Sequence, residues 1–131
     1  MADGAAPYHA HIYYSAEQRA RAEELRARFV DRAGSGDEPC ILFVGRMMNA
    51  AVGPHPMPQY EVHFLEPALA RVVAEIEASG LRALVHPLTE DDLADHTNLG
   101  RWIGERLQLD LSVLDPPGRN QGVARFGRTD L

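Results

Sequence analysis

Six histidines are the residues of this 131-residue chain whose type and spacing could support chemistry. They lie at or near the ends of apolar runs, at His9, His11, His55, His63, His86 and His96. Imidazole is the commonest side-chain ligand of divalent transition metals, and it also titrates near neutral pH. The sequence therefore predicts a metal centre or an acid–base site, provided that the fold brings these segments together.

The pair His9 and His11 lies in "YHAHIYY", which alternates with the period of a β-strand over residues 8–14. On a strand, residues i and i+2 project from one face about 7 Å apart. Two imidazoles placed in this way can share one ion. Ala10 and Ile12 fall on the opposite face and are expected to point into the core.

The remaining elements follow from periodicity and capping residues. Ser15 with Gln18 is typical of a helix start, and so is Thr89 with Asp92. We expect residues 101–114 to add a further strand pair. The predicted strands are 8–14, 40–47, 59–64 and 81–86, and the predicted helices are 16–33, a segment from Pro67 to Gly80, and a short one after Thr89.

This order, β-α-β-β-α-β, predicts an α+β fold of the ferredoxin-like type. In that fold an antiparallel sheet of strand order 4-1-3-2 carries both helices on one face. The other face then needs a cover, which could be a second subunit or the C-terminal segment. Residues 1–115 are expected to form one domain, and the tail 116–131, rich in Pro, Gly and Arg, is expected to be disordered.

Placed on this fold, the strand histidines meet at one corner of the open face. His96 lies one short turn beyond the fourth strand, and Glu61 and Asp95 are the nearest carboxylates. His55 belongs to the connection at the opposite end of the sheet. It can join the site if that loop folds over the open face, or if a partner subunit supplies it.

Composition narrows the classes of function. The net charge is −6 with a pI near 5.4, and no basic stripe is present, so nucleic-acid binding is not expected. No apolar run reaches 18 residues, which excludes a membrane helix from the prediction. The N-terminus lacks a secretory pattern and Cys40 is the single cysteine, so we expect a reducing cytoplasmic location.

Four motifs carry a resemblance to a known family. They are "YHAHIYY", "VGPHPMPQYEVHF", "LVHPLTEDDLADHT" and "WIGERLQLDLSVL", in this order. Together they resemble the small DOPA 4,5-dioxygenase family, which contains a fungal pigment enzyme and bacterial relatives. The resemblance implies extradiol ring cleavage of a catechol such as DOPA, with non-haem Fe(II) and O2. Zn2+ or another divalent metal is an alternative occupant.

The resemblance also implies roles for individual residues. The expected metal ligands are His11, His55 and His86. His9 or His96 is expected to act as the acid–base group, with Asp95 orienting an imidazole. Arg46 or Arg101 could hold a substrate carboxylate. His63 stands where the family does not generally carry histidine, so we expect it to support the pocket on the substrate side.

Two other kinds of function remain open at this stage. The same fold and histidines would suit a metal-dependent isomerase, or a hydrolase that uses Zn2+. Ferredoxin-like domains also serve as non-enzymatic dimers that bind small ligands. A homodimer is expected in any case, because one face of the sheet needs a cover.

Overall fold

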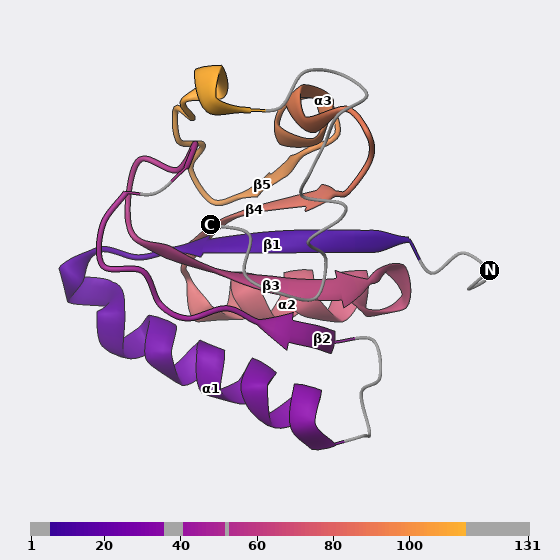
Figure 1. Cartoon of the computed structure of the whole chain (residues 1–131). Coiled ribbons are helices and arrows are strands. Elements are labelled where there is room, and N and C mark those ends of the chain that lie inside the picture. Colours follow the sequence, from indigo (N-terminus) through magenta and orange to yellow (C-terminus); the bar gives the residue numbers. More distant parts are fainter. Residues whose placement is uncertain (1–5, 36–40, 52, 115–131) are drawn as a thin grey trace.

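The computed structural model describes residues 6–35, 41–51 and 53–114, which are built around a five-stranded antiparallel sheet (Figure 1). The strands are β1 (Pro7–Tyr13), β2 (Ile41–Val44), β3 (Gln59–Leu65), β4 (Arg82–Pro87) and β5 (Arg101–Ile103). Their order across the sheet is β2-β3-β1-β4-β5. The first four strands keep the predicted ferredoxin-like order, and β5 extends the sheet beside β4.

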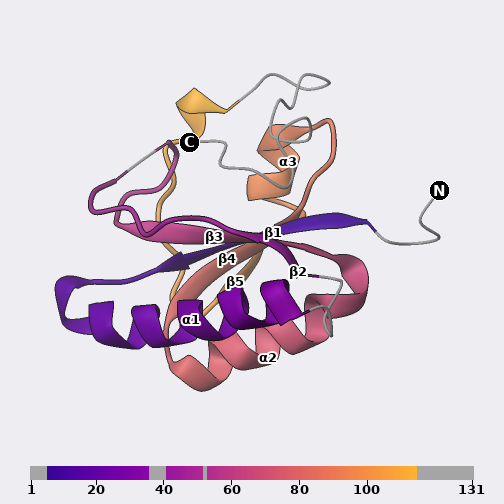
Figure 2. The same ribbon diagram turned by 60° about the horizontal axis from the view of Figure 1, so that its bottom comes forward.

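The two long helices cover one face of this sheet, while a short helix lies on the other face (Figure 2). The long helices are α1 (Arg19–Ser35) and α2 (Leu69–Ser79), and the short one is α3 (Asp92–His96). Single 3-10 turns at Ala16–Gln18 and Glu66–Ala68 lead into α1 and α2, and a third lies at Leu111–Val113. No helix within the described part of the chain is both long enough and apolar enough to cross a bilayer.

Local signals account for where the helices begin and end. The backbone N–H of Ser15 donates to the side-chain oxygen of Gln18 at 3.1 Å, as expected for a helix start. Gly80 ends α2 with φ of 76°, in the left-handed region that glycine adopts without a steric penalty. Val72, Val73 and Ile76 form the buried side of α2.

The hydrophobic core lies between α1, α2 and the sheet. Alternation along β1 sends Ala10 and Ile12 into this core and leaves His9 and His11 on the opposite face. The strand register aligns the imidazole-bearing positions, because His9 stands opposite His63 on β3 and opposite His86 on β4. Antiparallel pairing therefore produces the row of histidines that the alternation predicted.

Two predicted elements need correction. Asp91, not Thr89, caps α3, and its carboxylate accepts the N–H of Ala94 at 3.0 Å. The Thr89 hydroxyl instead donates to Asp95 at 2.6 Å and is not available as a cap. The strand pair predicted for 101–114 is one strand, β5, because Gly104, with φ of 76°, turns the chain away from the sheet.

The chain after Gly104 crosses the sheet face that α1 and α2 leave open. The backbone N–H of Asp110 donates to Pro54 O at 2.9 Å, which ties this segment to the loop before β3. Part of the predicted cover is thus supplied by the chain itself. The predicted tail 116–131 and Cys40 lie outside the described residues.

Candidate metal centre

All six histidines converge on the sheet face opposite α1 and α2. Each is at most 8% exposed, so the cluster is buried. Centroids of neighbouring rings lie between 3.7 and 6.4 Å apart. His9 and His11 come from β1, His63 from β3, His86 from β4, His96 from the end of α3, and His55 from the loop before β3.

The imidazoles of His11 and His86 face each other through their Nε2 atoms, which are 3.0 Å apart. On the far side of each ring, Nδ1 is next to a carbonyl oxygen. His86 Nδ1 donates to Pro87 O at 2.7 Å, and His11 Nδ1 donates to the side-chain oxygen of Gln59 at 3.0 Å. In neutral rings with this tautomer, both Nε2 atoms carry lone pairs, so the contact is repulsive unless a cation lies between them.

The spacing fits two ligands of one metal ion. Ligands at about 2.1 Å from an ion and at a right angle to each other are about 3.0 Å apart. His9 completes the set, since ligand nitrogens of His9, His11 and His86 all lie within 4.8 Å of one another. A carbonyl that fixes Nδ1–H and directs Nε2 inward is the usual outer partner of a metal-bound histidine. The donor set therefore fits a divalent transition metal.

Burial keeps these three imidazoles neutral. It lowers the pKa of His9, His11 and His86 well below the ordinary histidine value, and repulsion from neighbouring imidazolium charges adds to the effect. A metal binds the neutral form of imidazole. The site consequently needs no proton to be removed near neutral pH before a cation enters.

His9 is also part of a second group, together with His63 and Glu61. The ring of His63 stacks on that of His9 with centroids 3.7 Å apart and 12° between the planes. His63 Nε2 lies 2.6 Å from Glu61 Oε1, and both side chains are at most 2% exposed. This group also has the ligand spacing of a metal site. Because His63 is fully buried behind His9, the geometry favours support of His9 over contact with substrate.

His55 reaches the cluster within its own chain. The loop folds over the open face and brings the His55 ring to 4.2 Å from that of His11. The Tyr13 hydroxyl donates to His55 Nδ1 at 2.7 Å, and burial raises the pKa of Tyr13. Burial, with repulsion from His96 and His86, lowers the pKa of His55 to about 3. His55 is therefore a neutral imidazole beside the three grouped nitrogens.

His96 differs from the other histidines in its electrostatics. Burial alone would lower its pKa, but the hydrogen bonds and charge of Asp92 outweigh burial and raise the pKa above the ordinary value. His96 Nδ1 donates to Asp92 O at 2.8 Å and lies 3.4 Å from Asp92 Oδ1. Asp95, which we expected to orient an imidazole, accepts instead from the backbone and hydroxyl of Thr89.

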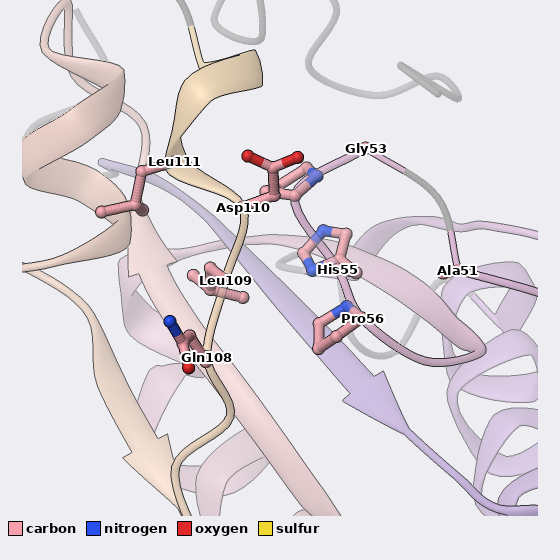
Figure 3. Close-up of a pocket in the computed structure, with 9 residues that line it drawn as sticks. Ala51, Gly53, His55, Pro56, Gln108, Leu109, Asp110 and Leu111 are labelled. Atoms are coloured by element: carbon pink, nitrogen blue, oxygen red, sulfur yellow. The ribbon is translucent and has the colours of Figure 1, made fainter.

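Two cavities border the cluster, one at His55 and one at His96. Their volumes are about 690 Å³ and about 530 Å³. Gln108, Leu109 and Leu111 line both cavities, so the segment after β5 separates them. Figure 3 shows this segment, with Leu109 and Asp110, running beside the loop that carries His55. Small molecules could approach the buried imidazoles from either side of it.

The two arginines proposed for substrate binding lie away from the cluster. Arg46 lines a hollow with Glu23 on α1, on the helix side of the sheet. Arg101 lies 4.0 Å from Glu77 of α2, also on the helix side. Gln59 was not among the expected site residues, although alternation places it on the same face of β3 as Glu61.

Fold and site together define a class: a ferredoxin-like α+β domain whose open face holds a buried, histidine-rich site that fits one divalent metal. Comparison with known families agrees with this class and narrows it. The model of the Dopa 4,5-dioxygenase family matches residues 8–113, and the chain belongs to that family.

Individual relatives support the assignment. DOPA 4,5-dioxygenase of Amanita muscaria is 33% identical over 113 residues, covering 82% of this chain and 49% of the fungal protein. An uncharacterised 21.2 kDa protein of Botryotinia fuckeliana is 30% identical over 121 residues, covering 79% of this chain and 61% of that protein. The chain thus spans about half to three fifths of the length of these relatives.

A solved structure matches the fold more completely. The crystal structure of a candidate dioxygenase from Nostoc punctiforme PCC 73102 superposes with a TM-score of 0.70 at 32% identity. The match covers 86% of this chain and 94% of the Nostoc chain. The match thus includes nearly the whole of the Nostoc chain.

Proposed function

We propose that the protein is an extradiol dioxygenase that opens the ring of a catechol such as DOPA, using non-haem Fe(II) and O2. The observation that carries the proposal is the 3.0 Å contact between the Nε2 atoms of His11 and His86. The Nδ1 atoms donate to carbonyl oxygens, so both Nε2 atoms carry lone pairs. A shared cation would remove the repulsion between these lone pairs. The family of the chain supplies the reaction class.

The proposed ligands are His9, His11 and His86. His9 takes the place that we had expected for His55, because its nitrogen belongs to the same group as those of the other two. His55 Nδ1 is already occupied by the Tyr13 hydroxyl, so the neutral ring carries its proton on Nε2. Bound Fe(II) would hold the catechol oxygens and O2 as neighbours and pass electron density between them.

His96 is the proposed acid–base residue. Its Nδ1 proton is fixed on Asp92 O, so its Nε2 can accept the phenolic proton and return it. Its ring centroid lies 4.3 Å from that of His86, and it also lines the cavity of about 530 Å³. The Asp92 carboxylate stabilises the imidazolium that forms when the proton is taken up. His96 can thus exchange a proton with a molecule bound next to the metal ligands.

The reaction needs no external reductant. The ring C–C bond beside the diol breaks, and both oxygen atoms of O2 enter the ring-opened product. The catechol supplies the four electrons that O2 accepts. The imidazoles are buried, and a bound metal and catechol there would be largely shielded from bulk water, which limits side reactions of the intermediates.

The direct test is anaerobic reconstitution with Fe(II), followed by a catechol and then O2. We expect a yellow ring-opened product that appears only after O2 is added, with one O2 consumed per catechol. His11→Phe should abolish it, whereas Arg46→Gln, on the helix side, should not. A protein that binds iron stoichiometrically but opens none of a panel of catechols would refute the proposal and favour the isomerase or hydrolase.

A homodimer that uses the open face of the sheet stays a prediction. The chain covers part of that face with the segment after Gly104, so a dimer is not needed to bring His55 into the site. Sedimentation equilibrium of the full chain measures the oligomeric state directly.

A further inference from the structure

The cavity beside His96 contains one arginine whose position suits a substrate contact. We propose that Arg106 binds the anionic side chain of the substrate, so that the enzyme selects catechols that carry a carboxylate. This inference rests on the proposed function, and it replaces Arg46 and Arg101 in the role of carboxylate anchor. Arg106 lines the same cavity of about 530 Å³ as His96 and Trp102.

The turn after β5 puts Arg106 in this place. Arg101 points toward Glu77 on the helix side, and alternation puts Trp102 on the histidine side of the sheet. Gly104 then takes a φ of 76°, and the chain leaves the sheet to run over the open face. Arg106 is two residues beyond this turn, so it lies at the cavity wall instead of continuing β5.

The guanidinium of Arg106 is available to a ligand. Across residues 6–35, 41–51 and 53–114 it makes no ion pair or hydrogen bond. Some other arginines on this domain are engaged, for example Arg32 with Glu75 and Arg26 with the backbone oxygen of Gly45, so that what distinguishes Arg106 is its place at the cavity wall beside His96. A guanidinium presents two parallel N–H donors that match a carboxylate.

The other walls of the cavity suit an aromatic acid. Trp102 is an aromatic wall held in a parallel arrangement with Tyr13, with centroids 6.0 Å apart and 20° between the planes. Leu107, Leu109 and Leu111 add apolar surface. A catechol placed here can direct its diol past His96 toward the metal ligands and its acid group toward Arg106. A cavity of this volume holds a single-ring compound.

The proposal predicts selectivity between catechols of equal ring chemistry. Substrates with a carboxylate, such as 3,4-dihydroxyphenylpropionate, should react with a higher kcat/KM than neutral 4-methylcatechol. Arg106→Gln should lower kcat/KM for the acid by about 10- to 100-fold, the range expected when a hydrogen-bonded ion pair is lost. The same variant should change kcat/KM for 4-methylcatechol by no more than about twofold. Arg106→Lys should recover part of the kcat/KM that Arg106→Gln loses for the acid.

Arg101→Gln is the matched control, because it removes the same charge from the helix side of the sheet. Arg101→Gln should change kcat/KM for neither substrate by more than about twofold. An equal effect of Arg106→Gln on both substrates, or no effect on the acid, would overturn the proposal.

A binding measurement separates this proposal from the proposed function. Calorimetry with iron-free protein and 3-phenylpropionate, which has no diol, should show binding that Arg106→Gln weakens by at least tenfold and Arg101→Gln does not. If no catechol is opened but this difference is seen, the dioxygenase proposal fails and the carboxylate site stands. If catechols are opened but the acid binds equally to all variants, only the carboxylate site fails.

Discussion

The neutral state of His55 has a measurable consequence for stability in the metal-free protein. The imidazole is 3% exposed, and burial with repulsion from two neighbouring histidines lowers its pKa to about 3. In the unfolded chain the pKa returns to about 6.5. As the pH falls, the unfolded chain therefore takes up a proton on His55 before the folded protein does, and the folded state loses stability.

The magnitude follows from this difference. The stability contributed by neutral His55 is complete above about pH 6.5 and is lost progressively as the pH falls toward 3. Between pH 8 and pH 5 the loss amounts to about 2 kcal/mol for this one group. The lowered pKa values of His9, His11 and His86 act in the same direction, whereas the raised pKa of His96 acts in the opposite one.

A variant isolates the His55 contribution. In His55→Gln the amide oxygen can still accept from the Tyr13 hydroxyl, but position 55 no longer titrates. Urea unfolding of EDTA-treated protein at pH 8 and pH 5 should show that the wild type loses about 2 kcal/mol more than the variant. Equal losses would mean that His55 is charged or solvated in the folded protein, and the description of the buried cluster would be incorrect.

Three further predictions concern the support of the site and the fold. His63→Phe keeps the stack on His9 but removes the buried hydrogen bond between His63 Nε2 and Glu61 Oε1, so the free energy of unfolding should fall by about 3–5 kcal/mol. Adding Glu61→Leu to this variant should restore most of the lost free energy of unfolding, as measured by urea unfolding. If the double variant keeps the full loss, this reasoning is contradicted. Gln59→Leu should weaken divalent-metal binding by about 10- to 100-fold in calorimetry, and unchanged affinity would show that this amide does not hold the His11 ring. Gly80→Ala should destabilise the protein by about 1–2 kcal/mol in thermal unfolding, because alanine is strained at φ of 76°, and a neutral effect would argue against that turn.

Much of the site could be predicted because it lies on strands. The period of two fixes which face each strand residue occupies, and antiparallel pairing fixes which residues stand opposite each other. His9 therefore had to meet His63 and His86 once the strand order was known. The same rule applied to "RWI" would have placed Arg101 with Ile103 on the core side and Trp102 on the histidine side.

The parts that could not be predicted depend on contacts outside the sheet. The position of His55 is set by a loop tied to the segment after β5 through Asp110 and Pro54, residues far apart in sequence. The site of Arg106 depends on the turn at Gly104, where alternation stops. Gln59 was on the correct face, but a glutamine is not a usual metal ligand, and its role appears only when its side chain is seen next to His11 Nδ1.

The most direct test of the metal centre is to count the imidazoles around the ion. X-ray absorption of the protein reconstituted with one Fe(II) should show three imidazole nitrogens at about 2.0–2.2 Å. The count should drop by one in each of His9→Phe, His11→Phe and His86→Phe, and should stay at three in His55→Gln. A full count in the His11 and His86 variants, or a loss in the His55 variant, would contradict the proposed ligand set.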